Sequence, residues 1–287
     1  MTKINKVTIL GTGVMGSQIA FQIAYSGFDV SAYDINEEIL DQARKKFAHL
    51  AAVYEKEVPN ADSDKTAKAI ARISLSSNLA EAAADADLVI EAVPEVLEIK
   101  RDIYEKLAKV APAKTIFATN SSTLLPSDIK DFTGRPDRFL AMHFANMIWK
   151  LNTAEIMGTP DTDPEVFDTV VAFASQIGMV PIPIHKEKAG YVLNSLLVPW
   201  LNAAADLAAG GYAMPEDIDK VWHIATGAPL GPFQIYDIIG LKTPYNILSH
   251  GDAHEQKLAA WLKENYIDKG KLGISTGAGF YTYPKPD

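Results

Sequence analysis

The 287-residue sequence contains no cysteine, which excludes disulfide bonds, thiolate nucleophiles and cysteine-ligated metals. It shows no continuous apolar run near the ~20 residues that a membrane-spanning helix needs, so we expect no membrane partner. The first residues lack the apolar core and the small-residue cleavage site of a secretory leader. Together these absences predict a cytoplasmic protein.

Positive charge is also scarce, because 27 Lys and Arg residues face 36 Asp and Glu residues, for a formal net charge of −9. No dense basic cluster is present, so we expect no nucleic-acid partner. An anionic ligand must therefore be held by local features of the chain. Of the histidines, His250 and His254 share a helical spacing but lack the glutamate of a zinc-binding helix, and we expect no metal site.

Strand-like and helix-like segments alternate through the first part of the chain. Strand-like apolar runs lie at residues 7–10, 28–33, 87–93, 115–118, 139–143, 154–156 and 180–184, and helical periods at residues 14–25, 36–50, 99–110 and 167–177. The polar residues 55–68 read as a loop or a loose helix pair. This alternation predicts an α/β fold with a Rossmann-like, doubly wound parallel sheet and helices on both faces.

The pattern changes near residue 186. Beyond it, helical periods at residues 192–209, 215–225, 235–248 and 254–266 are separated by clusters of glycine and proline. We therefore predict a Rossmann-like domain at residues 1–186 and a smaller all-helical domain at residues 187–287.

A glycine-rich turn, Gly11-Thr12-Gly13-Val14-Met15-Gly16, follows the first strand and opens the first helix. In this context the spacing is typical of a dinucleotide site, where backbone N–H groups and the helix N-terminus hold a pyrophosphate. Asp34 closes the second strand, where an acid accepts from ribose hydroxyls and favours NAD over NADP. The alternative is a purely structural turn, with Asp34 capping the next helix.

Polar side chains also follow later strands, at the sheet edge where open α/β folds bind ligands. His143 ends one strand and has the titration range of a general base. Glu155 lies on the next strand-like run, and a reversing loop would bring its carboxylate to the imidazole. Asn120 and Ser122 follow another strand. The alternative is an interior histidine with Glu155 as a charge at the sheet edge.

The sequence resembles the L-3-hydroxyacyl-CoA dehydrogenases nearly from end to end. The resemblance rests on GTGVMG (11–16), LVIEAVPE (88–95), NSS (120–122), RFLAMHFAN (138–146), GYVLNSLLVP (190–199), GAPLGPF (227–233) and GAGFY (277–281). Several spaced motifs in the same order make the similarity specific.

The resemblance implies roles for individual residues. It implies that His143 is the general base, that Glu155 is its paired acid and that Ser122 contacts the substrate oxygen. Asn194, otherwise a polar residue in an apolar helix, completes the site from the second domain. The resemblance also implies that Glu95, Lys100 and Asn120 line the nicotinamide half of NAD. It further implies a homodimer formed through the helical domain.

Two features depart from the family pattern. Trp149 and Lys150 lie between the base and its acid and border the substrate, or they are solvated loop residues. Ser195 stands where the family often has arginine. Basic residues that could meet CoA phosphates also alternate with acids, as on a plain solvated face: Arg44, Lys45, Lys46, Lys56, Lys65, Lys68 and Arg72.

We therefore expect an NAD-dependent enzyme of fatty acid metabolism that interconverts short-chain (3S)-3-hydroxyacyl-CoA and 3-oxoacyl-CoA. One alternative is a dehydrogenase of free 3-hydroxy acids, such as gulonate or carnitine. Another is a non-catalytic NAD-binding structural protein on the same scaffold.

Overall fold

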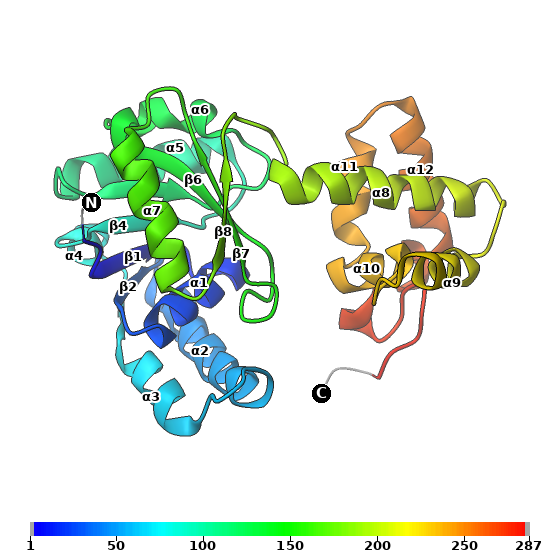
Figure 1. Cartoon of the computed structure of the whole chain (residues 1–287), viewed down its shortest axis with the longest axis horizontal. Coiled ribbons are helices and arrows are strands. Elements are labelled where there is room, and N and C mark those ends of the chain that lie inside the picture. Colours follow the sequence, from blue (N-terminus) through cyan, green and yellow to red (C-terminus); the bar gives the residue numbers. More distant parts are fainter. Residues whose placement is uncertain (1–2, 285–287) are drawn as a thin grey trace. The chain divides into compact units, whose positions relative to one another are not determined.

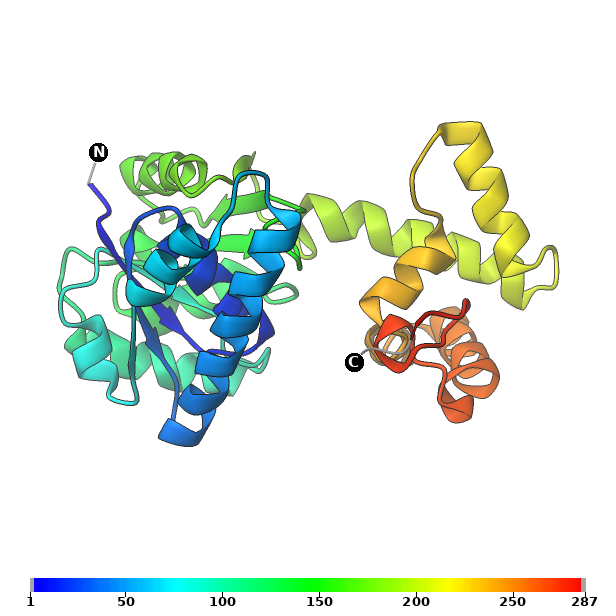
Figure 2. The ribbon, with the colours of Figure 1, turned by 90° about the horizontal axis from the view of Figure 1, so that it is seen from below.

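The computed structural model describes residues 3–284. The chain forms two compact units, whose boundary falls between Val192 and Leu193. This lies slightly beyond the predicted boundary at residue 186, because the chain stays with the first unit as far as the first turn of helix α8 (Tyr191–Ala209). Figures 1 and 2 show the strands in the first unit and helices α8 to α12 in the second.

The first unit contains one eight-stranded sheet with the order β3-β2-β1-β4-β5-β6-β7-β8. Its strands are β1 (Lys6–Leu10), β2 (Asp29–Tyr33), β3 (Ile73–Ser76), β4 (Leu88–Glu91), β5 (Ile116–Thr119), β6 (Phe139–Phe144), β7 (Thr153–Gly158) and β8 (Val180–Ile184). Neighbouring strands are parallel except for the antiparallel pair β6 and β7. The predicted doubly wound sheet is confirmed, and the chain reverses between β6 and β7, where a reversing loop was expected between His143 and Glu155.

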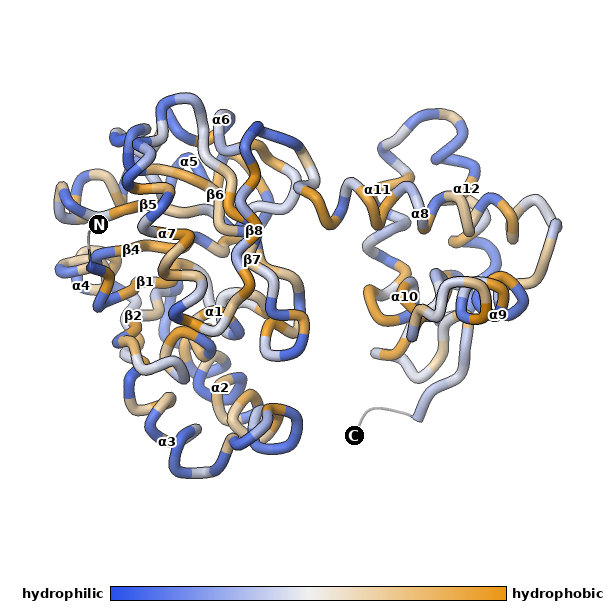
Figure 3. Tube along the Cα trace, viewed as in Figure 1, coloured by the Kyte–Doolittle hydropathy of each residue, from blue (hydrophilic) through white to orange (hydrophobic). Residues whose placement is uncertain are grey.

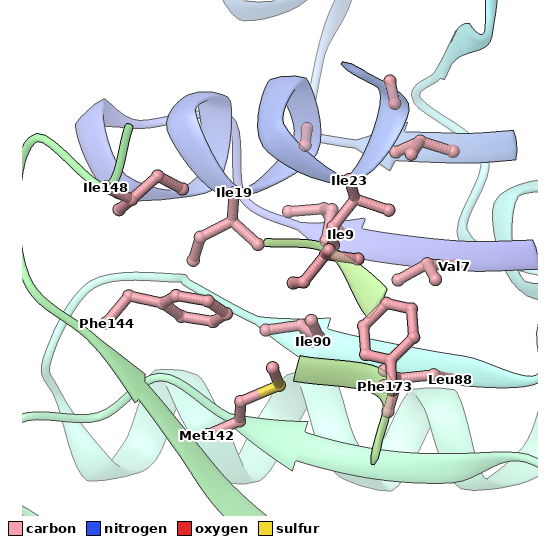
Figure 4. Packing of buried hydrophobic residues seen from close by; sticks show 14 of the residues in the cluster. Val7, Ile9, Ile19, Ile23, Leu88, Ile90, Met142, Phe144, Ile148 and Phe173 are labelled. Carbon is pink, nitrogen blue, oxygen red and sulfur yellow. The ribbon is translucent and has the colours of Figure 1, made fainter. Parts of the chain in front are cut away.

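Helices cover both faces of this sheet. They are α1 (Val14–Tyr25), α2 (Glu37–Glu57), α3 (Ser63–Ala71), α4 (Leu79–Ala83), α5 (Leu97–Val110), α6 (Pro126–Ile129) and α7 (Pro164–Gln176), with short 3-10 turns at Lys130–Thr133 and Pro136–Arg138. Alternate strand residues face opposite cores. Ile90 packs with Ile19 of α1 and Phe173 of α7 (Figure 4), whereas Val89 packs with Leu107 of α5 on the other face.

The region that sequence analysis left as a loop or loose helix pair is regular. Helix α2 begins after Asn36, whose side chain accepts from the Ile39 N–H, and continues to Glu57 rather than residue 50. Tyr54 explains the extension, because it is buried and donates its hydroxyl hydrogen to Gln22 of α1. Helix α3 and the half-buried edge strand β3 follow.

The second unit packs around Phe233, Tyr236, Leu258 and Leu262. Its remaining elements are α9 (Pro215–Thr226), α10 (Pro232–Ile239), α11 (Lys242–Ser249), α12 (Ala253–Asn265) and 3-10 turns at Ile267–Lys269 and Ile274–Thr276. The predicted single helix at residues 235–248 is wrong. Gly240, with φ of +85°, ends α10 and lets the chain turn into α11.

Helix α8 stands apart in its composition. Within residues 3–284 it is the one helix whose 19-residue length and mean hydropathy of 1.3 are sufficient to cross a membrane, although only 17% of that stretch is buried. Sequence analysis predicted this helix at residues 192–209 but found no apolar run of membrane-spanning length, because Asn194 and Asn202 interrupt the apolar residues. Figure 3 shows the mixed colouring of α8 and the orange strands of the sheet.

Candidate active site

His143 and Glu155 lie directly opposite each other on the antiparallel strands β6 and β7. Both side chains are buried, with 5% and 4% of their surface exposed. The imidazole Nδ1 lies 2.9 Å from Glu155 Oε2. The sheet register therefore brings together the two residues that the sequence placed on neighbouring strand-like segments.

The other nitrogen of this imidazole faces Ser122. Its Nε2 lies 3.1 Å from Ser122 Oγ, on the loop that follows β5. A carboxylate only accepts hydrogen bonds, so Glu155 assigns the proton of the neutral ring to Nδ1. The lone pair of Nε2 then points toward Ser122, where it can take a proton from a hydroxyl group bound beside the serine.

The Ser122 loop is fixed by a carboxylate beneath it. Glu95 Oε1 accepts hydrogen bonds from the Ser121 hydroxyl and from the backbone N–H groups of Ser122 and Thr123. Lys100 Nζ lies 3.2 Å from Glu95 Oε2 and 2.6 Å from Glu91 Oε1. Burial alone would raise the pKa of the Glu95 carboxyl, but the Ser121 bond and the Lys100 charge lower it to about 2. Glu95 is therefore an anion that anchors the loop.

This network bears on two residues expected near the nicotinamide. Lys100 is fully buried against carboxylates, which gives it a structural partner in the chain itself. Asn120 Oδ1 accepts from the Phe144 N–H at 3.0 Å, so its amide braces the end of β6 next to His143. The contacts of Glu95, Lys100 and Asn120 with a cofactor remain predictions.

The glycine-rich turn has the geometry that a dinucleotide needs. A Cβ on Gly16 would lie 1.9 Å from the Gly11 carbonyl oxygen, so only glycine lets α1 approach β1 this closely. A Cβ on Gly13 would meet nothing within 4 Å, and no side chain caps the α1 N-terminus there. The first N–H groups of α1 are thus open to an anion, as the pyrophosphate of NAD requires.

Comparison with known proteins identifies the family of the chain that carries this site. Residues 6–188 match the family "3-hydroxyacyl-CoA dehydrogenase, NAD binding domain", and residues 190–283 match its C-terminal domain.

The chain belongs to the 3-hydroxyacyl-CoA dehydrogenase family.

Among relatives in this family, a probable 3-hydroxybutyryl-CoA dehydrogenase of Bacillus subtilis is 33% identical and is aligned over 98% of both chains. The solved (S)-3-hydroxybutyryl-CoA dehydrogenase of Ralstonia eutropha has 30% identity and a TM-score of 0.86, and the match covers 99% of this chain and 100% of that one. A solved diketoreductase that acts on dicarbonyl compounds has 65% identity and a TM-score of 0.96, with the same coverage. The chain thus carries an NAD-binding domain and is a dehydrogenase-family oxidoreductase.

Asp34 lies beside the NAD-binding turn of this family member. Its Oδ2 accepts from both the N–H and the hydroxyl of Thr12, at 2.7 and 2.8 Å, while Oδ1 accepts from the Ile35 N–H. Lys46 Nζ donates to the Thr12 carbonyl oxygen. Asp34 therefore holds the turn in place, and its contact with a ribose stays a prediction.

The loop between β6 and β7, residues 145–152, is tied to helices α1 and α2. Gln18 donates to Asn146 Oδ1 and accepts from the N–H groups of Met147 and Ile148. Trp149 packs on Tyr54 and donates its indole N–H to Glu57, while Lys150 is exposed. Sequence reasoning missed Gln18, because a glutamine in a helix gives no signal of a partner distant in sequence.

Tyr191 was also missed. Its ring stacks on His143, with ring centroids 4.3 Å apart, and its hydroxyl donates to the Ser121 carbonyl oxygen. The motif GYVLN drew attention to Asn194 instead, because only the asparagine is unusual in an apolar helix. Asn194 lies on α8 within the second unit, and its role in completing the site stays a prediction.

The basic residues considered for CoA largely meet acids or carbonyl groups of the chain. Arg44 pairs with Asp41, Lys68 with Asp64 and Arg72 with Asp29, all at 3.0 Å or less. Such solvent-exposed ion pairs contribute little to the stability of the fold. They fit a solvated face and leave CoA recognition a prediction.

Proposed function

We propose that this protein uses NAD(H) to interconvert short-chain (3S)-3-hydroxyacyl-CoA and 3-oxoacyl-CoA. The line from Ser122 Oγ through His143 to Glu155 carries the proposal, because it supplies an oriented base for a hydroxyl proton. Membership of the dehydrogenase family and the names of its relatives support the thioester substrate.

In the oxidation direction, His143 Nε2 takes the proton of the 3-hydroxyl group. Glu155 holds the Nδ1 proton and balances the charge of the imidazolium that forms. The Ser122 hydroxyl positions the substrate oxygen, and Asn194 is proposed to contact it as well. NAD held at the turn from Gly11 to Gly16 would supply the acceptor for the hydride of C3, and NADH would supply the hydride in the reverse direction. The alcohol thus loses a proton from its oxygen and a hydride from C3, and a ketone remains.

A second candidate substrate class is dicarbonyl compounds that carry no CoA. The 65% identity to a diketoreductase over 99% of this chain favours it. The same base and serine would serve, because reduction of either substrate protonates a carbonyl oxygen. For a free 3-hydroxy or 3-oxo acid, which is the remaining alternative, Lys150, exposed on the β6–β7 loop, is proposed to meet the carboxylate.

One assay separates these substrate classes. NADH oxidation is followed at matched concentrations of acetoacetyl-CoA, free acetoacetate and ethyl acetoacetate, and then repeated with NADPH. The thioester proposal predicts the highest kcat/KM for acetoacetyl-CoA, and the Asp34 assignment predicts a preference for NADH. A higher kcat/KM for the ester favours the second candidate. No turnover with any of the three contradicts both.

We also propose a homodimer formed through the helical unit. Large apolar side chains are exposed on two of its helices, namely Leu196 and Leu207 on α8 and Val221 and Ile224 on α9, with exposed fractions between 46% and 75%. A small helical unit gains stability by burying such surface against a second copy. This is also why we propose a protein partner, rather than a membrane, for the apolar surface of α8.

A further inference from the structure

The imidazole of His143 has contacts beyond its two nitrogens. Its hydrogen-bond partners, Glu155 at Nδ1 and Ser122 at Nε2, lie at opposite sides of the ring. Bonds at these two atoms leave the ring able to tilt about the line that joins them. The Tyr191 ring restricts this rotation, because it lies on one face of the imidazole with an interplanar angle of 14°.

Tyr191 is itself held firmly. It is 1% exposed, and its hydroxyl donates to the Ser121 carbonyl oxygen at 2.7 Å. Its φ of +54° lies in the left-handed region, which a bulky residue adopts only when its surroundings impose it. The next residue, Val192, donates its N–H to Glu155 Oε1 at 2.8 Å. One dipeptide therefore contacts the base, its acid and the loop that carries Ser122.

We propose that Tyr191 is a positioning residue, which fixes the plane of the His143 imidazole and with it the direction of the Nε2 lone pair toward the reacting oxygen. This inference rests on the proposed function, since it concerns the same proton transfer. The face of the phenol ring also favours the imidazolium that forms during oxidation. Burial, followed by the nearby carboxylates of Glu95 and Glu155, raises the pKa of the Tyr191 phenol. Tyr191 thus keeps its proton and acts through His143.

The kinetic test compares Tyr191→Phe with Tyr191→Leu. Phenylalanine keeps the ring face, so kcat should stay within about threefold of the wild type, whereas leucine should lower kcat by roughly 10- to 100-fold. In both variants the KM of the carbonyl substrate and the Kd of NADH should change by less than about threefold. If Tyr191→Leu misfolds, Tyr191→Asn replaces it, because asparagine tolerates a left-handed φ.

Tyr266→Leu is the matched control. Tyr266 lies in the helical unit, and its ring centroid is 4.2 Å from that of Phe280. This control should lower Tm without changing kcat. A wild-type kcat in Tyr191→Leu overturns the inference. So does an equal loss in Tyr191→Phe, which would assign the effect to the hydroxyl group, or a parallel loss of NADH affinity, which would assign it to general structure.

A second measurement does not depend on activity. A tyrosine ring stacked on an imidazole shifts the carbon-bound imidazole protons upfield in the NMR spectrum. In histidine-labelled protein, the His143 signals, assigned from the His143→Gln variant, should move downfield in Tyr191→Leu and stay in place in Tyr191→Phe. Unmoved signals in Tyr191→Leu overturn the stacking. If the wild type reduces none of the substrates, the proposed function fails, while this spectrum still decides the contact.

Discussion

At the scale of single residues, His143, the proposed base, is restrained at Nδ1, at Nε2 and on one ring face. His143→Ala should lower kcat by ~10²–10⁴, the usual contribution of a positioned acid–base group. Glu155→Gln should lower kcat less, because the amide oxygen still orients the ring but no longer balances its charge. Stopped-flow NADH absorbance would measure both, with Kd of NADH as the control. Near-normal turnover of His143→Ala would remove it from the mechanism.

Glu95 gives a prediction about pH. Its pKa of about 2 lies below the ordinary glutamate value, so it stabilises the fold above pH 4.5, and this contribution disappears as the pH falls toward 2. Because a third of the side chain faces solvent, the contribution is about 1–2 kcal/mol. Urea unfolding of Glu95→Gln should therefore differ from the wild type at pH 7 and converge with it near pH 2. A constant difference across this range would contradict the assignment.

Only some of the residues of the site could be predicted from the sequence. His143 ends a strand-like run, Ser122 follows one and Glu155 lies on the next, so the order of strand-like runs was enough to predict that the three residues meet at one edge. Tyr191 and Gln18 could not be found this way, because an aromatic residue and an amide are ordinary on helices. Their importance comes from residues distant in the sequence, such as Ser121 for Tyr191 and Met147 for Gln18.

At the scale of elements, helix α1 reaches from the NAD-binding turn to the β6–β7 loop through Gln18. Gln18→Leu removes the acceptor of the Ile148 N–H and leaves the Met147 N–H with Asn146 Oδ1 alone, which should cost about 1–3 kcal/mol. Hydrogen exchange measured by mass spectrometry should become faster in peptides covering residues 145–148. Gln22→Leu is the matched control, because Gln22 lies one turn along α1 and bonds to the Ile177 carbonyl oxygen and the Tyr54 hydroxyl rather than to residues 145–148. Equal exchange in both variants would contradict the role of Gln18.

The same loop provides a test of substrate choice. If Trp149 borders the acyl group, Trp149→Ala should shift kcat/KM toward longer acyl chains, by ~1–3 kcal/mol per methylene. Trp149→Phe keeps the packing on Tyr54 and should retain the wild-type preference. Lys150→Met should depress activity on free acids and leave thioesters unchanged. An unaltered substrate profile in all three variants would mean that the loop takes no part in substrate choice.

Helices and strands could be predicted from the sequence where the hydrophobic period agrees with the burial of the side chains in the fold. The strands of the sheet centre are continuous apolar runs, and they were found. Strand β3 was not, because Ile73–Ser76 is a short edge strand with two serines and little burial. The split between α10 and α11 was missed because the apolar period continues across Gly240, and only its positive φ shows that the helix ends there.

At the scale of the whole molecule, the exposed apolar residues of α8 and α9 predict a dimer. Leu196→Glu and Ile224→Glu place a charge on that surface, which is 69% and 75% exposed at these positions within one chain. Light scattering after gel filtration should give a dimer for the wild type and a monomer for the double variant. Lys257→Glu, at an exposed position of helix α12, is the charge control and should stay dimeric. A monomeric wild type would contradict the proposal.

The antiparallel register of β6 and β7 has a consequence for how such proteins diversify. His143 and Glu155 face each other because of ladder pairing, to which the intervening residues 145–152 contribute nothing. Lengthening a loop costs little free energy, about 0.6 kcal/mol for each doubling. Segments of other lengths can therefore be inserted between these strands while the proton-transfer pair stays aligned, provided that an anchor equivalent to Gln18 is retained. Selection and laboratory evolution can thus exchange residues 145–152 as a separate module, without changing the pairing of His143 and Glu155 beside them.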